Sequence, residues 1–156
     1  MPYSSVDAVS LDLHDAALLH RDPPAERSRL ATRRFVAAAA KQWFTVDGSS
    51  DEILCAQIMI TRFASAVDAS LAQADSWSEL HAGNAVFRKV AVQDHEYRVA
   101  VVSDAGVTHT LAFGTVDDVA VAAFSSHGGA DGCIAATARL LSLTLRAVAT
   151  STSTGA

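Results

Sequence analysis

Hydrophobic positions in the first half of the chain recur at helical spacing and predict three helices, over about residues 4–20, 25–44 and 51–74. The segment Asp22-Pro23-Pro24 ends the first helix and suits the first turn of the second, because proline lacks the amide hydrogen that a helix interior needs. The pattern Ser49-x-x-Glu52 resembles a capping box and opens the third helix. Apolar residues cover more than one face of that third segment, so we expect it to be central.

Beyond a polar linker at 75–84 the periodicity changes to alternation and predicts four strands, over 85–93, 96–103, 107–113 and 119–125. Their connections are too short for the crossover that parallel strands need, so we expect an antiparallel meander. A last helix to about residue 150 carries a clean apolar stripe of Ile134, Ala138, Leu141, Leu145 and Val148.

The predicted fold class is therefore α+β in two layers. It has three N-terminal helices, a four-stranded antiparallel meander and a C-terminal helix packed on the sheet. We expect one domain over 1–150 and a disordered tail over 151–156, since that tail holds only serine, threonine, glycine and alanine.

The strand at 119–125 is neutral, and at a sheet edge it would have to be covered or paired with another copy. This predicts a homodimer. Over 51–148 the order of a helix, antiparallel strands and a closing helix resembles the roadblock and profilin-like dimerisation modules. The resemblance rests on element order and on no residue motif, and it implies self-association.

Composition narrows the class of protein. The chain has 156 residues, of which 50% are hydrophobic and 19% charged, and this suits one globular domain. Two cysteines do not make a secreted disulfide framework. The N-terminus lacks the pattern of a signal peptide, and no apolar run reaches the roughly 20 residues that cross a bilayer. We therefore predict a cytoplasmic protein with no membrane contact.

The charge is unevenly distributed. Residues 21–41 hold six basic and two acidic side chains, a net charge of +4, and leave −9 for the rest of the chain. This pattern predicts a partner surface for an acidic protein or a small anionic ligand, made of Arg27, Arg29, Arg33 and Arg34. The alternative is a solvated helix face balanced by neighbouring carboxylates. Nucleic-acid binding is not favoured, because the net charge is −5 and no reading element is recognisable.

The glycine-rich loop at 125–133 is the strongest candidate for chemistry. A helix begins after it, so its free amides suit an anion, and we assign ligand binding to Gly128, Gly129, Asp131 and Gly132. In one hypothesis Cys133 is a nucleophile assisted by His127, a catalytic pair. In the other, the glycines and Asp131 only build a turn and a helix cap while Cys133 packs as a small apolar residue.

His109 is the remaining candidate, because it alternates with apolar positions on a strand and would face the interior as a base or ligand. A core histidine with one hydrogen bond is the alternative. No metal-binding spacing occurs, and we expect neither a metal nor a cofactor. The function predicted overall is a small non-catalytic interaction or ligand-binding domain that self-associates. The alternative is a small enzyme or an anion or nucleotide sensor that uses the loop at 125–133.

Overall fold

The computed structural model describes residues 3–5, 7–45, 53–128 and 133–153, which form eight strands and four helices. The first half of the chain gives β1 (Tyr3–Ser5), β2 (Val9–Leu11), α1 (Leu13–Leu18), α2 (Pro23–Thr32), β3 (Phe35–Thr45), β4 (Ile53–Phe63) and α3 (Ala66–Ala82). The second half gives β5 (Val86–Val92), β6 (His95–Asp104), β7 (Val107–Val116), β8 (Val119–His127) and α4 (Ile134–Ser153).

All strands belong to one antiparallel sheet in the order β1-β3-β4-β8-β7-β6-β5. The short strand β2 pairs with residues 38–40 of β3, and β1 pairs with residues 43–45 of the same strand. Both occupy the same edge, so eight strands fill seven positions across the sheet. The other edge is β5, which pairs only with β6 among the described strands.

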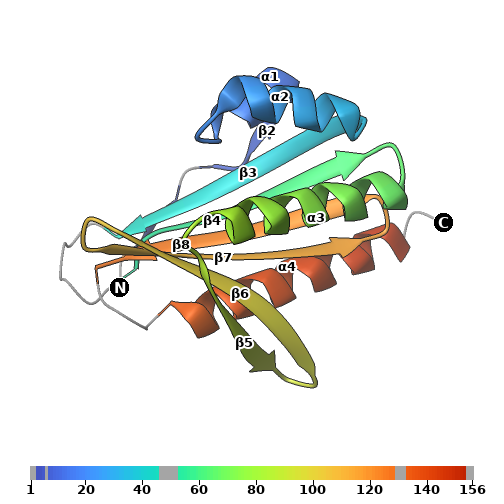
Figure 1. Ribbon diagram of the computed structural model, residues 1–156. Coiled ribbons are helices and arrows are strands. Elements are labelled where there is room, and N and C mark those ends of the chain that lie inside the picture. The colour runs from blue at the N-terminus through green and yellow to red at the C-terminus, as the bar shows by residue number, and fades with distance from the viewer. Residues whose placement is uncertain (1–2, 6, 46–52, 129–132, 154–156) are drawn as a thin grey trace.

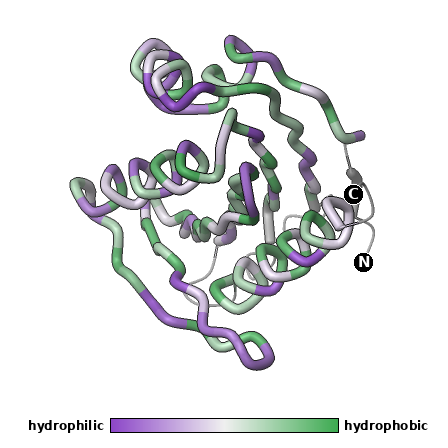
Figure 2. Tube along the Cα trace, turned by 90° about the vertical axis from the view of Figure 1, so that its right-hand side faces the viewer, coloured by the Kyte–Doolittle hydropathy of each residue, from purple (hydrophilic) through white to green (hydrophobic). Residues whose placement is uncertain are grey.

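Helices cover both faces of the sheet (Figures 1 and 2). Helix α4 lies on one face, where it packs on Val121 and Ala123 of β8. Helix α3 lies on the opposite face together with α1 and α2, which contact β3. Successive side chains of a strand point to opposite faces, so β8 supplies residues to both cores.

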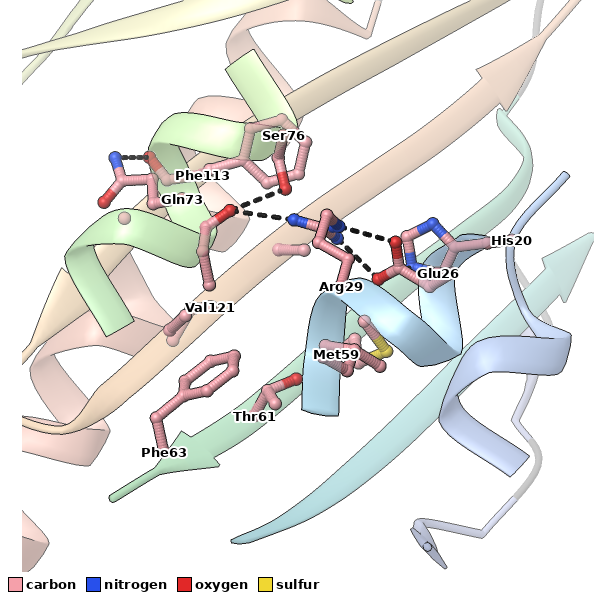
Figure 3. A pocket seen from close by; sticks show the side chains of 15 residues that line it. His20, Glu26, Arg29, Met59, Thr61, Phe63, Gln73, Ser76, Phe113 and Val121 are labelled. Carbon is pink, nitrogen blue, oxygen red and sulfur yellow. Dashed lines mark hydrogen bonds and ion pairs between the residues drawn. The ribbon is translucent and has the colours of Figure 1, made fainter. Parts of the chain in front are cut away.

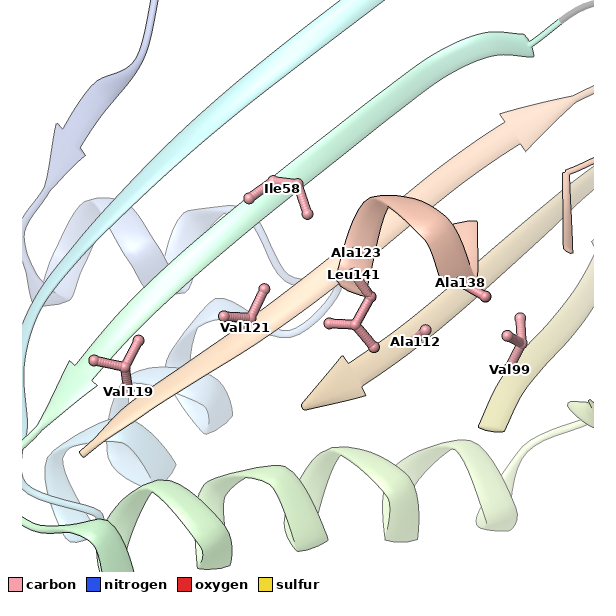
Figure 4. Packing of buried hydrophobic residues seen from close by; sticks show 8 residues of the cluster. All are labelled: Ile58, Val99, Ala112, Val119, Val121, Ala123, Ala138 and Leu141. Carbon is pink, nitrogen blue, oxygen red and sulfur yellow. The ribbon is translucent and has the colours of Figure 1, made fainter. Parts of the chain in front are cut away.

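The larger core lies between α4 and the sheet (Figure 4). Ala138 and Leu141 of α4 are fully buried against Val99, Ala112 and Val121 of three strands. Helix α4 lies so close to β7 that a Cβ at Gly114 would come within 2.6 Å of the Leu145 side chain. The stripe predicted for the C-terminal helix is therefore the stripe that builds this core.

Two of the predicted helices are wrong. The segment predicted as a helix over 25–44 ends its helix at Thr32 and continues as β3, and the segment over 51–74 begins with β4 before α3. Both strands have a neighbouring strand on each side, and both carry apolar residues at successive positions instead of alternating ones. In β3 this run is only partly buried, because Val36, Ala37 and Phe44 are exposed. A continuous apolar run fits a buried strand as well as a buried helix, and Ala37-Ala38-Ala39-Ala40 favoured the helix only by propensity.

The predicted first helix is also mostly wrong. Residues 4–20 hold β1, β2 and only the short helix α1, whose N-cap is Asp12. The predicted linker at 75–84 is largely the second half of α3. Helix α2 does begin on Pro23 with Asp22 as its N-cap, as the prolines indicated.

The second half of the chain agrees with the prediction in its elements. All four late strands are present and pair as neighbours in an antiparallel meander, and the C-terminal helix follows them. That helix extends to Ser153, so the first residues of the predicted disordered tail are helical, while 154–156 lie outside the described residues. The fold class as a whole is corrected: a sheet of seven positions covered on both faces replaces a two-layer, four-stranded one.

The predicted edge strand at 119–125 is central. β8 pairs with β4 on one side and β7 on the other, and its neutral, small side chains fit a strand buried on both faces. The argument for a dimer through this strand therefore no longer holds, and the resemblance to dimerisation modules fails with it, because a strand replaces much of the expected central helix. The edge strand β5 instead carries Arg88 and Lys89, charges that discourage pairing with another chain.

A closed ring of hydroxyl groups lies inside the interface between α4 and the sheet. Thr110 of β7, Ser125 of β8 and Thr137 of α4 are each at most 2% exposed, and their oxygens lie 2.6 Å apart in all three pairs. Each hydroxyl can donate once and accept once within the ring, so the three polar groups are satisfied without water.

We predict that Thr137→Val lowers the free energy of unfolding by about 1–2 kcal/mol, because it removes one member of a buried network and leaves the other two with fewer partners. Urea unfolding followed by circular dichroism measures this. Thr144→Val is the matched control, since that hydroxyl bonds only the Leu140 carbonyl of its own helix. Equal losses for the two variants would contradict a stabilising role of the ring.

Candidate functional site

A pocket opens between α2, α3 and the sheet (Figure 3). Its floor is apolar and comes from strands β4, β7 and β8, with Leu30 of α2 and Ala72 of α3 at the sides. The enclosed volume is about 60 Å³, which is room for a small ligand group or a few water molecules. The main floor residues are Met59, Phe63, Phe113, Ala120, Val121 and Ala122.

A buried carboxylate stands at the rim of this pocket. Glu26 of α2 is only 5% exposed, and Arg29, one turn later on the same helix, holds it with two hydrogen bonds of 2.7 and 2.5 Å. His20, which precedes α2, places its Nε2 atom 3.2 Å from Glu26 Oε1. A buried carboxylate needs such partners because removal of a charge from water is costly.

Ion pairs fasten α2 to α3 across the pocket. Arg29 donates to the Ala72 carbonyl at 3.1 Å, and Arg33 donates to both carboxylate oxygens of Asp75 at 2.7 and 3.0 Å. Arg34, in the left-handed conformation that ends α2, pairs with Asp68 of α3. These hydrogen bonds lower the pKa of Asp68 and of Asp75. The two walls are thus held at a fixed separation, and the pocket is formed in advance of any ligand.

The rim offers acceptors more than donors. Arg29 directs three hydrogen bonds at its own chain, the Gln73 amide nitrogen donates to the Phe113 carbonyl at 3.4 Å, and the Ser76 hydroxyl donates to Ala72 at 3.2 Å. What remains beside the apolar floor are three acceptors, the Gln73 carbonyl oxygen, the Ser76 oxygen and the Glu26 carboxylate, and the Thr61 hydroxyl, which can donate or accept. This arrangement suits a ligand with an apolar body and a hydrogen-bond donor.

His20 makes stability depend on pH. Burial lowers the pKa of His20 below its usual 6.5, and Glu26 opposes that shift only in part. The unfolded chain therefore binds this proton more readily than the folded chain, so stability falls as the pH drops through 6.5. We predict a lower free energy of unfolding at about pH 5 than at about pH 7.

In the variant His20→Gln that difference should shrink, as urea titrations at the two pH values would show, because no group at this position then takes up a proton. Asp68 and Asp75, with lowered pKa values, lose their contribution only as the pH falls below 3.8 and do not confuse the comparison. An unchanged difference in the variant would locate the pH dependence elsewhere.

The arginines predicted as a partner surface are mostly engaged within the chain. Arg29, Arg33 and Arg34 each pair with a carboxylate, whereas exposed Arg27 makes no ion pair within the described ranges. The structure therefore agrees with the alternative that neighbouring carboxylates balance this helix. Asp68 and Asp75, which lie 34 and 42 residues from their arginine partners along the chain, cancel two of the four excess positive charges read from the sequence.

The glycine-rich loop lies at the end of β8. His127 and Cys133 on either side of it are 2% and 3% exposed, Gly128 is exposed, and Gly129, Asp131 and Gly132 lie outside the described residues. Burial raises the pKa of the Cys133 thiol, although a hydrogen bond with Ser125 opposes it. A raised pKa disfavours the thiolate that a nucleophile needs. The catalytic pair and the loop as a ligand site stay predictions.

His109 lies on β7 and faces the same side of the sheet as α3. It is half-buried and stacks on Phe124 with ring centroids 5.6 Å apart, and its buried Nδ1 atom has no hydrogen-bond partner among the described residues. It is not among the residues that line the pocket. The register pairs His109 with Ser126, the neighbour of His127, so the two histidines lie on adjacent strands but point to opposite faces of the sheet.

Most residues of the pocket escaped the sequence analysis. His20 and Glu26 precede or begin α2, Gln73 and Ser76 lie on α3, and Phe113 lies on β7, so only the fold joins them. Glu26 was counted as one acid within a basic segment. The one available indication was its spacing of three residues from Arg29, which is common on solvated helices and predicts no pocket.

Comparison with known proteins gives one fold neighbour. No family model matches the chain, and no curated protein matches its sequence. A search of solved structures finds the extracellular domain of PknH from Mycobacterium tuberculosis, with a TM-score of 0.59 over 94% of this chain and 86% of that one. The chain shares the fold of that domain. The sequence identity is 12%, so the likeness carries no function.

Two further properties bear on the predicted class. None of the described helices is long and apolar enough to cross a membrane. Among the residues that the structure describes, no group of three or more His, Cys, Asp and Glu side chains gathers as a metal site would require. The likeness to an extracellular domain gives no support to the cytoplasmic location that the sequence predicted.

Proposed function

We propose that this protein is a non-catalytic binding domain, and that it holds a small ligand in the pocket between α2 and α3. The observation that carries the proposal is the buried Glu26 carboxylate, which stands beside an apolar floor and is already fixed by Arg29 and His20. A few fixed polar groups above an apolar surface are typical of small-molecule sites.

The chemistry of the pocket selects the ligand class. Phe63 and Phe113 offer apolar contact to a ring or a short aliphatic group, and the remaining acceptors of Glu26 and Gln73 suit a hydroxyl or an amine. A carboxylate ligand would face the Glu26 carboxylate and is disfavoured.

Self-association and a cytoplasmic location are two further proposals. A homodimer would now have to use a surface other than β8, because that strand is internal. A cytoplasmic location is supported by the two free cysteines, Cys55 and Cys133, which suit a reducing compartment. The enzyme that uses His127 and Cys133 remains the alternative, and the raised pKa of the thiol counts against it.

The experiment compares three probes of equal shape by NMR chemical-shift titration: benzyl alcohol, toluene and benzoate. Benzyl alcohol should shift amides of α2, α3 and the pocket floor and should bind at least about tenfold more tightly than toluene or benzoate, since it alone supplies a neutral donor. Equal affinity for all three probes, or shifts spread over the whole surface, would contradict the proposal.

A pocket-filling variant gives the control. Ala122→Leu places a larger side chain on the half-buried floor and should abolish the shifts, whereas Val67→Ala on the exposed side of α3 should leave them unchanged. Thermal unfolding of both variants verifies that they remain folded. Retained binding in a folded Ala122→Leu variant would place the ligand outside this pocket.

A further inference from the structure

A second groove lies on the α4 side of the molecule, between that helix and the end of β5 with the turn that follows it. Its volume is about 380 Å³, which falls within the range of small-molecule sites. The groove is separate from the α2–α3 pocket and shares no residue with it. Its lining consists of Ala91, Val92, Gln93, Arg139, Ser142, Leu143 and Arg146.

The two arginines of this groove are available to a ligand. Arg139 and Arg146 are exposed and make no ion pair within the described part of the chain, and Arg146 donates only to the Gln93 side chain. No carboxylate lines the groove. This contrasts with α2, where Arg29, Arg33 and Arg34 are each neutralised by an acid.

The distance between the two arginines and the apolar surface between them define the shape of the ligand. They are seven positions apart on α4, so their Cα atoms are separated by about 10.5 Å along one side of the helix. Between them lies Leu143, a leucine that is 65% exposed, with Val92 on the opposite wall. Two cationic ends thus flank an apolar middle.

Ser142 lies between the two arginines on the same helix and lines the groove. It is only 3% exposed, and its side chain adds no charge to the lining.

We propose that this groove binds a small organic dianion whose two acidic groups are separated by an apolar spacer. One acidic group pairs with Arg139 and the other with Arg146, because a guanidinium binds a carboxylate or phosphate through parallel hydrogen bonds. The spacer covers Leu143. The small anionic ligand that the charge pattern placed on α2 is thereby assigned to α4.

The negative net charge of the protein favours binding of an anion at this local site over nonspecific binding elsewhere on the surface. The protein carries a net charge of −5, so the molecule as a whole repels anions and binding must come from a local site. A pair of separated cations also prefers a dianion of matching length over a single anion, since one end of the site would otherwise stay unpaired.

Isothermal titration calorimetry with the linear dicarboxylate suberate tests the proposal, with the shorter succinate and the monoanion octanoate as matched ligands. We expect suberate to bind at least about tenfold more tightly than either of the others. Arg139→Gln and Arg146→Gln should each weaken suberate binding by about tenfold or more, whereas Arg27→Gln should not change it. All three arginines are exposed, so these variants should fold normally.

Three results would overturn the proposal: no heat of binding for suberate, equal affinity for octanoate and suberate, or tight binding by an acidic peptide alone. Loss of benzyl alcohol binding in Ala122→Leu should leave suberate binding unchanged, so the two sites succeed or fail separately.

Discussion

Replacing Glu26 by alanine should lower the free energy of unfolding by about 3–5 kcal/mol and remove ligand binding at the α2–α3 pocket together. The carboxylate is 5% exposed and pairs with Arg29 and His20, so its loss leaves the half-buried Arg29 guanidinium with only the more distant Asp75, at 3.9 Å, as a counter-charge. Breaking one side of a buried ion pair is strongly destabilising for that reason. Chemical unfolding and the benzyl alcohol titration measure the two effects.

An exposed ion pair provides the comparison. Glu96 lies 3.0 Å from Lys89, and both side chains are more than half exposed, so Glu96→Ala should cost no more than about 1 kcal/mol. Similar losses of unfolding free energy for Glu26→Ala and Glu96→Ala would mean that the buried ion pairs of Glu26 stabilise the protein no more than an exposed pair does. A stable Glu26→Ala variant that still binds benzyl alcohol would also remove the observation on which the proposed function rests.

Leu141→Ala should have an effect of similar size on stability, about 2–5 kcal/mol, through packing alone. Leu141 is fully buried where α4 crosses the sheet, among Val99, Ala112 and Val121, so its removal opens a cavity in the larger core (Figure 4). The shift in the midpoint of urea unfolding at unchanged slope measures the loss.

Leu143→Ala is the matched control, because Leu143 lies on the same helix but is 65% exposed. That variant should change the free energy of unfolding by about 0.5 kcal/mol or less. A loss below about 1 kcal/mol for Leu141→Ala would contradict the placement of α4 over this face of the sheet. Ligand binding at the α2–α3 pocket should be unaffected by either variant.

The elements of the second half of the chain were predictable because each carries a local pattern of one period. Strands β5 to β8 are joined by three short turns, and each turn contains a residue in the left-handed conformation: Gln93, Ala105 or Asp117. The stripe of α4 repeats at helical spacing because only one side of that helix meets the sheet.

The first half was not predictable by the same means. β3 and β4 lie inside the sheet, and both carry apolar residues at successive positions, such as Ala37 to Ala40 and Ile58 to Ile60, so neither shows the alternation that predicts a strand. In β4 the β-branched residues Ile58, Ile60 and Thr61 are a local feature that favours a strand. The many apolar residues over 51–74 nevertheless led to the prediction of a central helix. β1 and β2 are three residues each and are strands only because β3 offers them a partner.

The candidate site shows the same division. The sequence singled out the arginines of α2, and the structure shows why charge counting misled: Asp68 and Asp75, distant along the chain, lie against Arg34 and Arg33. The sequence analysis did not single out Arg139 and Arg146. These arginines are candidates for ligand binding because no acidic residue is among the described residues that line their groove, and this is known only from the structure. Neither the ion pairs of α2 with distant acids nor the acid-free lining of the α4 groove can be predicted from neighbouring positions in the sequence.

By itself, the sequence determined the features that depend on near neighbours: the proline start of α2, the turns of the meander, the apolar stripe of α4 and the overall negative charge. Only the tertiary structure decided that β3 and β4 are strands, that β8 is internal, and that Glu26 is buried beside a pocket. The physical reason is that strand pairing and burial are interactions between distant segments, and these can override local propensity.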